Sequence, residues 1–132
     1  MKLTYWWIEA LVIAVIFFTA ALCYGDEGLA SWYSTESCQR EGTSGTWTAS
    51  GERFSDEGLT CAMRSRDFGK YYKITNRAND KSVIVRHNDF GPNKRCFDRG
   101  VRVDLSKEAY KRVASLKTGL IEVLIEVCDE PK

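Results

Sequence analysis

VIVRHNDFGPNKRC, residues 83–96, contains a strand followed by a chain break. Its β-branched residues favour an extended strand over residues 82–88. Gly91-Pro92 then ends the strand and starts a turn. Asp89 lies between the two, where its carboxylate either accepts backbone N–H groups of the turn or takes part in the chemistry of a site. The segments on either side of this stretch decide between the two interpretations.

Similar short segments, rich in Val, Ile, Thr and Tyr and separated by Gly, Asn and Asp, occur on both sides of it. We predict strands at residues 28–34, 59–63, 71–76, 82–88, 101–105 and 119–128. We expect a polar, Gly-rich loop over residues 38–47 and a turn over residues 48–54. Apolar residues at helical spacing predict one short helix that Ser106 caps and Thr118-Gly119 ends. The pattern predicts a mainly β fold, a small β-barrel, rather than a doubly wound sheet.

The length and the charge of the chain limit what the protein can be. Its 132 residues are enough for one modest domain. Lys and Arg number 19 and Asp and Glu 18, so the net charge is close to zero. Binding to nucleic acid usually requires a clear basic excess, so we expect no nucleic-acid partner.

The N-terminus, MKLTYWWIEALVIAVIFFTAALCYG, has the pattern of a secretory signal peptide. Lys2 supplies the positive start, and residues 11–22 are apolar apart from Thr19. We therefore interpret residues 1–25 as a signal peptide that is cleaved after Gly25. This predicts a secreted or periplasmic protein of the cell envelope.

Two other interpretations of the same segment remain open. Residues 5–24 are about long enough to span a bilayer as an anchor, although Glu9 lies within them and no basic cluster follows. The second interpretation is lipid attachment at Cys23, although Leu22 is large for the residue before a lipidation site. In either case we expect contact with a membrane only through the N-terminus.

Beyond this segment the chain has four widely spaced cysteines: Cys38, Cys61, Cys96 and Cys128. An even number of cysteines in a small exported domain predicts two disulfides, with three possible pairings that the sequence leaves open. Zinc is disfavoured, since the chain has no CxxC motif and His87 is its only histidine. We expect neither a metal nor another cofactor.

Three segments occur in one order along the chain: GLASWYS at 28–34, TASGERF at 48–54 and VRHNDFGP at 85–92, with VDLS at 103–106 after them. In this order and spacing the chain resembles the rare-lipoprotein-A-like family, whose domains are double-psi β-barrels related to barwin and expansins. The resemblance covers residues 28–127. It implies that residues 26–132 form a six-stranded double-psi β-barrel domain with one short helix.

The resemblance implies a lytic transglycosylase that acts on peptidoglycan. Such enzymes cleave the β-1,4 bond between N-acetylmuramic acid and N-acetylglucosamine without water, because the 6-hydroxyl of the sugar attacks and a 1,6-anhydro end forms. One carboxyl group can protonate the leaving oxygen and then accept the hydroxyl proton, whereas ordinary glycosidases need two carboxylates. We therefore expect the domain to bind a peptidoglycan or other polysaccharide strand. We expect it to be a monomer.

The resemblance also implies which residues act. Asp89 matches the catalytic aspartate of the family, and Glu52 matches the glutamate that flanks it. When two carboxylates lie side by side, the pKa of one of them is raised, as an acid requires. Two polar positions of the bacterial enzymes differ here. Ser55 stands in the place of an acidic residue, with Asp56 next to it, and Met63 stands in the place of a histidine.

Four residues are candidates for substrate binding: Trp47, His87, Asn88 and Ser55. Trp47, in the polar loop, carries an indole on which a sugar ring could stack. Alternation along the strand places His87 on the same side as Asp89, and Arg86 with Asn88 on the other side.

The main alternative function is non-catalytic binding or loosening of polysaccharide, as in expansins and barwin proteins. Ser55, Met63 and the cysteines favour this alternative. In expansins the aspartate before Leu-Ser is the functional acid, but here Arg102-Val103 precede Asp104 as in the bacterial pattern, which indicates a structural role. A third possibility, a secreted inhibitor that binds a protein, has no specific support in the sequence.

Overall fold

The computed structural model describes residues 25–42 and 45–132. Its strands are β1 (Asp26–Tyr33), β2 (Thr60–Met63), β3 (Tyr71–Asn76), β4 (Ser82–Phe90), β5 (Val101–Ser106) and β6 (Ile121–Cys128). Its helices are α2 (Thr35–Arg40), α3 (Lys94–Asp98), α4 (Lys107–Lys111) and the 3₁₀ turn η2 (Leu116–Thr118). The predicted signal peptide, the anchor and the lipidation site at Cys23 lie outside the described residues. Within them, no helix is long and apolar enough to cross a membrane.

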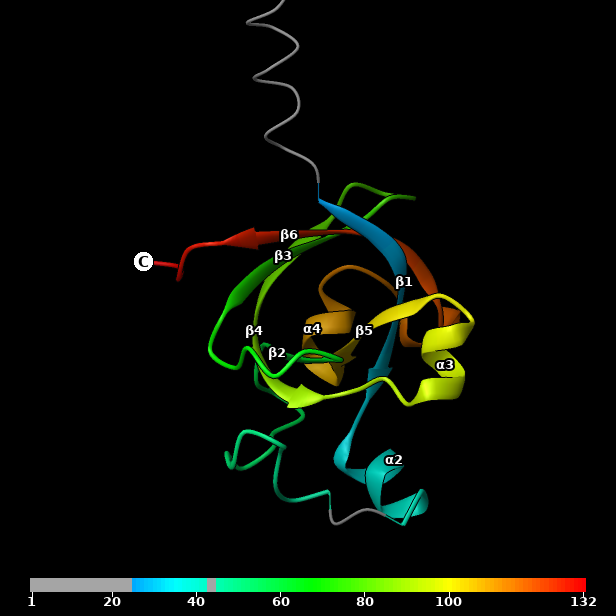
Figure 1. Ribbon diagram of the computed structural model, residues 1–132. Coiled ribbons are helices and arrows are strands. Elements are labelled where there is room, and N and C mark those ends of the chain that lie inside the picture. Colours follow the sequence, from blue (N-terminus) through cyan, green and yellow to red (C-terminus); the bar gives the residue numbers. More distant parts are fainter. Residues whose placement is uncertain (1–24, 43–44) are drawn as a thin grey trace, which may run out of the picture.

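The six strands form a closed barrel in the order β1-β5-β2-β4-β3-β6 (Figure 1). The pairs β1/β5 and β2/β4 are parallel, and the remaining pairs are antiparallel. Each predicted strand is present, with its ends shifted by two residues at most. The prediction of a mainly β, six-stranded barrel is confirmed.

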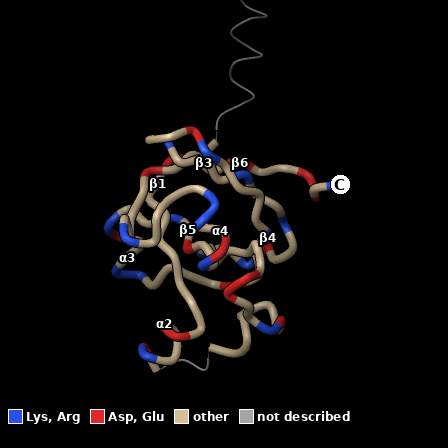
Figure 2. Tube along the Cα trace, turned by 180° about the vertical axis from the view of Figure 1, so that it is seen from behind, with Lys and Arg blue, Asp and Glu red and all other residues tan. Residues whose placement is uncertain are grey.

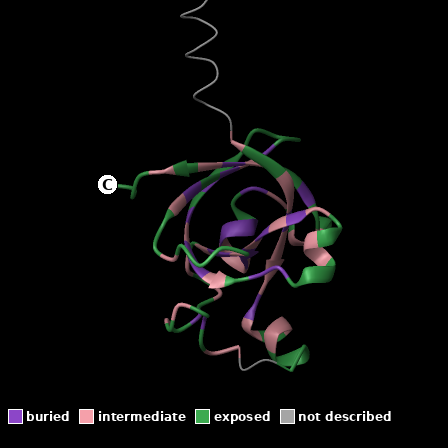
Figure 3. Ribbon diagram, in the orientation of Figure 1, coloured by how far each residue is buried: buried purple, intermediate pink, exposed green. Residues whose placement is uncertain are grey.

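The interior of the barrel holds a cluster of buried, mostly apolar residues. The buried parts of the strands and of α4 are purple in Figure 3. Alternate residues of the strands point inward, so that β5, for example, buries Val101, Val103 and Leu105. Helix α4 packs against β5, β1 and β4 and adds the fully buried Tyr110. Each buried Leu or Val side chain contributes about 1.5–3 kcal/mol to folding, so this core holds the ends of the strands in place.

The single helix predicted from the sequence is one of three short α-helices among the described residues. Ser106 caps α4 as predicted, because its hydroxyl accepts the N–H of Ala109, but the helix ends at Lys111. Helix α2 lies where we expected the start of a loop. Ser34 and Ser37 form a reciprocal capping box there, which stabilises a short helix that has no buried residue.

The pairing of β4 with β2 is irregular next to Asp89. Cys61 pairs with His87 and Ala62 pairs with Asp89, so Asn88 is an extra residue in β4. An extra residue of this kind bends the strand and redirects the side chains after it. The alternation that we extrapolated from His87 to Asp89 is therefore interrupted between them.

The two predicted disulfides are not confirmed, since no disulfide is present among the described residues. Cys61 lies fully buried in the core, and burial raises the pKa of its thiol. Cys96 is partly exposed on α3, and Cys128 is partly exposed at the end of β6.

Candidate active site

A cavity of about 500 Å³ lies between the barrel and α2. Its volume is within the range of small-ligand sites. The C-terminal ends of β1 and β4, the middle of β5, helix α2 and the segment before β2 contribute to its wall. The polar and aromatic lining includes Ser31, Tyr33, Glu41, Trp47, Asp89 and Asp104. We call it the Asp89 cavity.

Three donors hold the Asp89 carboxylate in place. Its Oδ1 accepts the backbone N–H groups of Ala49 and Phe90, both at 2.9 Å, and its Oδ2 accepts the Tyr33 hydroxyl at 3.2 Å. All three partners donate, and an ionised carboxylate can accept every one of them. One of the three is the Phe90 amide of the turn, which the sequence suggested, but Asp89 also lines the cavity.

Tyr33 also lines the cavity and donates its hydroxyl to Asp89. Its ring stacks on Phe54, with 4.7 Å between the ring centroids. Burial, and then the neighbouring Asp89 charge, raises the pKa of the Tyr33 hydroxyl. The phenol therefore stays protonated at any pH at which the protein would work, and it remains a donor to Asp89.

Asp104 is a second carboxyl group in the same cavity. Burial raises its pKa to about 6, and the negative charges of Glu41 and Asp89 act in the same direction. The Ser31 hydroxyl donates a hydrogen bond to Asp104 and partly opposes this shift. A Cβ at Gly91 would lie 3.3 Å from Asp104 Oδ2, so the glycine leaves room for the carboxyl group.

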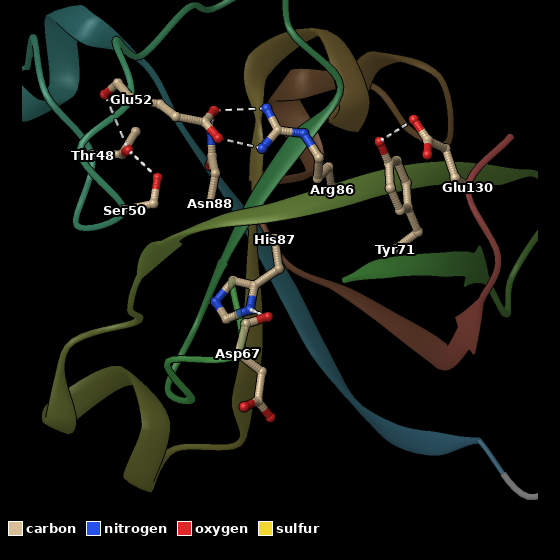
Figure 4. Close-up of polar contacts among 9 residues, drawn as sticks. All are labelled: Thr48, Ser50, Glu52, Asp67, Tyr71, Arg86, His87, Asn88 and Glu130. Atoms are coloured by element: carbon tan, nitrogen blue, oxygen red, sulfur yellow. Dashed lines mark hydrogen bonds and ion pairs between the residues drawn. The ribbon is translucent and has the colours of Figure 1, made fainter. Parts of the chain in front are cut away.

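Glu52 lies elsewhere and is engaged by Arg86. Both oxygens of Glu52 accept from the Arg86 guanidinium, one of them at 2.6 Å, and Asn88 Nδ2 donates to Oε2 at 3.3 Å (Figure 4). The hydrogen bonds from Arg86 lower the pKa of the Glu52 carboxyl. Glu52 is not among the residues that line the Asp89 cavity, so the predicted pairing of Glu52 with Asp89 is not seen.

The contacts of Glu52 place it in a supporting position. Its backbone carbonyl accepts from the Thr48 N–H at 2.8 Å, and Ser50 N–H donates to the Asn88 carbonyl at 3.2 Å. These contacts hold the turn of residues 48–52 against β4. The same turn supplies the Ala49 N–H that binds Asp89, so Glu52 is connected to Asp89 through the backbone of the turn.

The four predicted substrate-binding residues have different positions. Trp47 lines the cavity and is 62% exposed, with the Arg53 guanidinium 5.7 Å from its ring centroid. His87 is fully buried, points away from Arg86 and Asn88 in Figure 4, and packs near Phe68. Asn88 is also buried, and Ser55 is exposed outside the cavity lining. Only Trp47 of the four reaches the cavity.

Tyr33 and Asp104 are the site residues that local sequence patterns did not identify. Tyr33 reaches Asp89 across 56 positions of the chain, and Ser31 reaches Asp104 across 73. The signal for Asp104 was its place in VDLS, which we interpreted as structural. Since the parallel β1/β5 pair places Ser31 opposite Asp104, the barrel itself brings this carboxyl group into the cavity.

Glu52→Gln is expected to lower the free energy of unfolding at neutral pH by about 0.5–1 kcal/mol, because Arg86 loses a two-point carboxylate partner. Both side chains are partly exposed, at 31% for Arg86 and 41% for Glu52, and solvent limits the value of the pair. The lowered pKa of Glu52 means that this stability is present at neutral pH and is lost as the pH falls below about 4.5.

Urea denaturation at pH 7 and at pH 3 measures this effect. Glu57→Gln is the matched control, since Glu57 is an exposed glutamate of the same segment without an ion pair among the described residues. A Glu52→Gln protein as stable as the control at pH 7 would show that the ion pair does not stabilise the fold.

Comparison with known proteins identifies the family to which the domain is similar. A family model described as a lytic transglycolase matches residues 26–125. A probable endolytic peptidoglycan transglycosylase RlpA from Nostoc sp. is 42% identical over 101 residues, which cover 76% of this chain and 25% of that protein. The endolytic peptidoglycan transglycosylase RlpA of Rickettsia felis is 36% identical over 103 residues, which cover 78% of this chain and 42% of that protein. The chain thus spans less than half the length of these relatives.

Solved structures with the same fold have more distant sequences. A Streptomyces papain inhibitor superposes with a TM-score of 0.59 at 16% identity, over 81% of this chain and 98% of its own. An expansin of Clavibacter michiganensis superposes with a TM-score of 0.56 at 20% identity, over 80% of this chain and 51% of its own. Both are double-psi barrel proteins, which confirms the predicted type of barrel.

Proposed function

The chain belongs to the lytic transglycolase family, and from this membership we propose that it cleaves the glycan strands of peptidoglycan as a lytic transglycosylase. The bond cleaved is the β-1,4 bond between N-acetylmuramic acid and N-acetylglucosamine, and the product has a 1,6-anhydro end. The family itself confirms the resemblance seen in the three motifs of the sequence. The names of the relatives at 36–42% identity support the reaction.

One observation carries the proposal: two carboxyl groups, Asp89 and Asp104, line a single cavity in different surroundings. Asp104 is partly buried, and its raised pKa of about 6 lets it hold a proton in mildly acidic solution. Asp89 is surrounded by three donors that its carboxylate accepts. Carboxyl groups in contrasting environments can divide the roles of acid and base.

In the proposed reaction Asp104 donates its proton to the glycosidic oxygen as the bond from that oxygen to C1 of the muramyl residue breaks. The 6-hydroxyl oxygen of the same residue forms the new bond to C1, and Asp89 accepts the hydroxyl proton. No water is consumed. The proton then returns from Asp89 to Asp104 through solvent before the next cycle.

Trp47 supplies a surface for the sugar chain. Its exposed indole lies at the rim of the Asp89 cavity, and flat aromatic faces pack well on the C–H faces of pyranose rings. A strand stacked on Trp47 would extend into the cavity next to the two carboxyl groups.

Digestion of purified peptidoglycan sacculi tests the proposal. The soluble products are separated by chromatography and identified by mass spectrometry, in which a 1,6-anhydro end is lighter by one water than a reducing end. We expect 1,6-anhydro products from the wild-type protein. Products with only reducing ends, or no soluble products, would rule the reaction out.

A second candidate function is binding of polysaccharide without cleavage, and the position of Glu52 favours it. The glutamate that flanks the aspartate in the family is held by Arg86 outside the cavity in this chain. Sedimentation with insoluble peptidoglycan, cellulose and chitin, combined with the product assay, separates the two functions. Retention on a polysaccharide without new chain ends would favour binding alone.

A further inference from the structure

A row of alternating arginine and phenylalanine side chains passes the Asp89 cavity. In order, it consists of Arg66, Phe90, Arg64, Phe97 and Arg102. The guanidinium carbon of Arg66 lies 4.8 Å from the Phe90 centroid, and that of Arg64 lies 5.2 Å from Phe90 and 5.4 Å from Phe97. Arg102 completes the row at 4.1 Å from Phe97. We call these five residues the Arg/Phe row.

The three cations of the row have no anionic partner within the part of the chain that the structure describes. Some of the other basic residues do: Arg86 pairs with Glu52, Lys94 with Asp98, and Arg112 with Glu108. Arg64 and Arg66 are exposed, and Lys and Arg residues also gather around the neighbouring α3 (Figure 2). In a chain of net charge +1, this is a local excess of positive charge.

Arg64 connects the row to the site. Arg64 and Phe90 both line the Asp89 cavity, on the side where β4 ends. The Nη1 group of Arg64 donates to the Pro92 carbonyl at 3.0 Å, and the two phenylalanine rings fix the plane of the guanidinium. A guanidinium has five N–H donors, so this arrangement leaves donors for a ligand in a preorganised group.

We propose that Arg64, assisted by Arg66, binds a carboxylate carried by the glycan strand while the sugar backbone lies in the Asp89 cavity. This inference rests on the proposed function, because it takes the occupant of the cavity to be a peptidoglycan strand. The cavity otherwise presents Glu41, Asp89 and Asp104, so a carboxylate has its favourable position at the arginine end. Arginine is the side chain best suited to bind a carboxylate through two parallel hydrogen bonds.

The carboxylate has two possible sources on a muramyl residue. One is the lactyl carboxylate of a residue without a peptide, and the other is a carboxylate of the attached peptide. A strand of N-acetylglucosamine alone carries neither. The subsite therefore favours muramyl-containing strands over chitin and fixes their direction relative to Asp89 and Asp104.

Equilibrium binding at low ionic strength tests the subsite with four soluble probes. These are chitohexaose, peptide-free peptidoglycan strands, the same strands with their carboxyl groups converted to methylamides, and peptide-bearing strands. The proteins are wild type, Arg64→Gln, Arg64→Lys, Arg66→Gln and the control Arg112→Gln. Arg112 is an exposed arginine of similar charge outside the cavity lining, and its ion pair is of the weak surface kind. Thermal unfolding verifies that each variant is folded.

For Arg64→Gln we expect about tenfold weaker binding to the strands that carry the recognised carboxylate, and no change with chitohexaose or the methylamides. Arg64→Lys should recover part of the loss, because it keeps the charge but not the two-point geometry. Loss with the peptide-free strands assigns the lactyl carboxylate, and loss only with the peptide-bearing strands assigns the peptide. The preference of the wild-type protein for carboxylate-bearing strands over chitohexaose should weaken as salt is added.

Equal binding of wild type and Arg64→Gln to every probe, or an equal loss for Arg112→Gln, would overturn the inference. Cleavage of the strands is scored in parallel by the formation of 1,6-anhydro ends. Carboxylate-dependent binding without cleavage would refute the proposed reaction and leave the subsite standing. Cleavage that is unaffected by methylamidation and by Arg64→Gln would support the proposed reaction and refute the subsite.

Discussion

Asp89→Asn is expected to slow the formation of 1,6-anhydro ends by about 10³-fold, since the variant has no base for the 6-hydroxyl proton. The fold should persist. The amide oxygen can still accept the Ala49 and Phe90 N–H groups, and its NH₂ group can donate to the Tyr33 oxygen. The measurement is the rate of appearance of 1,6-anhydro products from sacculi, with thermal unfolding as the check on structure.

Asp98→Asn serves as the matched control for this substitution. This substitution makes the same chemical change on α3, where the Asp98 carboxylate pairs with Lys94 outside the cavity lining. We expect the control to cleave at the wild-type rate. An Asp89→Asn protein that retained more than about a third of the wild-type rate would show that another group accepts the proton, and the assignment of Asp89 would be wrong.

Asp104→Asn has the second large expected effect, about 10²-fold on the cleavage rate, because the leaving oxygen loses its proton donor. The pH dependence gives the sharper test. An acid works only while protonated, so the wild-type rate should fall as the pH rises through about 6, the raised pKa of Asp104. In Asp104→Asn this decline should be absent from the residual rate.

The same pKa makes a separate prediction about stability. Because the pKa of Asp104 rises from 3.8 to about 6 on folding, its contribution to stability is fully present below about 3.8 and is lost as the pH rises through about 6. The loss is about 3 kcal/mol for a shift of this size. Relative to wild type, Asp104→Asn should therefore gain stability between pH 4 and pH 7, as urea denaturation can measure. A difference in stability between the two proteins that does not change with pH would mean that folding does not raise the pKa of Asp104.

The strands and the family could be predicted from the sequence because the residues that indicate them lie in short contiguous segments. Segments rich in Val, Ile, Thr and Tyr between Gly, Asn and Asp located the strands, and GLASWYS, TASGERF and VRHNDFGP identified the barrel. The cap at Ser106 was also predictable, because capping depends on residues three positions apart. Alternation correctly placed Arg86 and Asn88 together, and both contact Glu52.

The composition of the cavity could not be predicted in the same way. Glu52 and Arg86 are 34 positions apart, so the motif that named Glu52 gave no indication of the ion pair that holds it. The extra residue at Asn88 separates Asp89 from His87, and a period-two pattern cannot show where such an insertion lies. Asp104 enters the cavity because β5 lies beside β1, which is a property of the closed barrel.

The strand order of the barrel has a consequence for the folding of the chain during its synthesis. Strand β1 is made first, yet both of its neighbours, β5 and β6, belong to the last part of the chain, residues 101–128. At a synthesis rate of about 5–20 residues per second, roughly 5–20 s pass between the start of β1 and the completion of both of its partner strands. A strand with two open edges for that long is prone to pair with other chains. The three polar or charged residues at the start and middle of β1, Asp26, Glu27 and Ser31, limit that risk while the nascent strand waits for its partners.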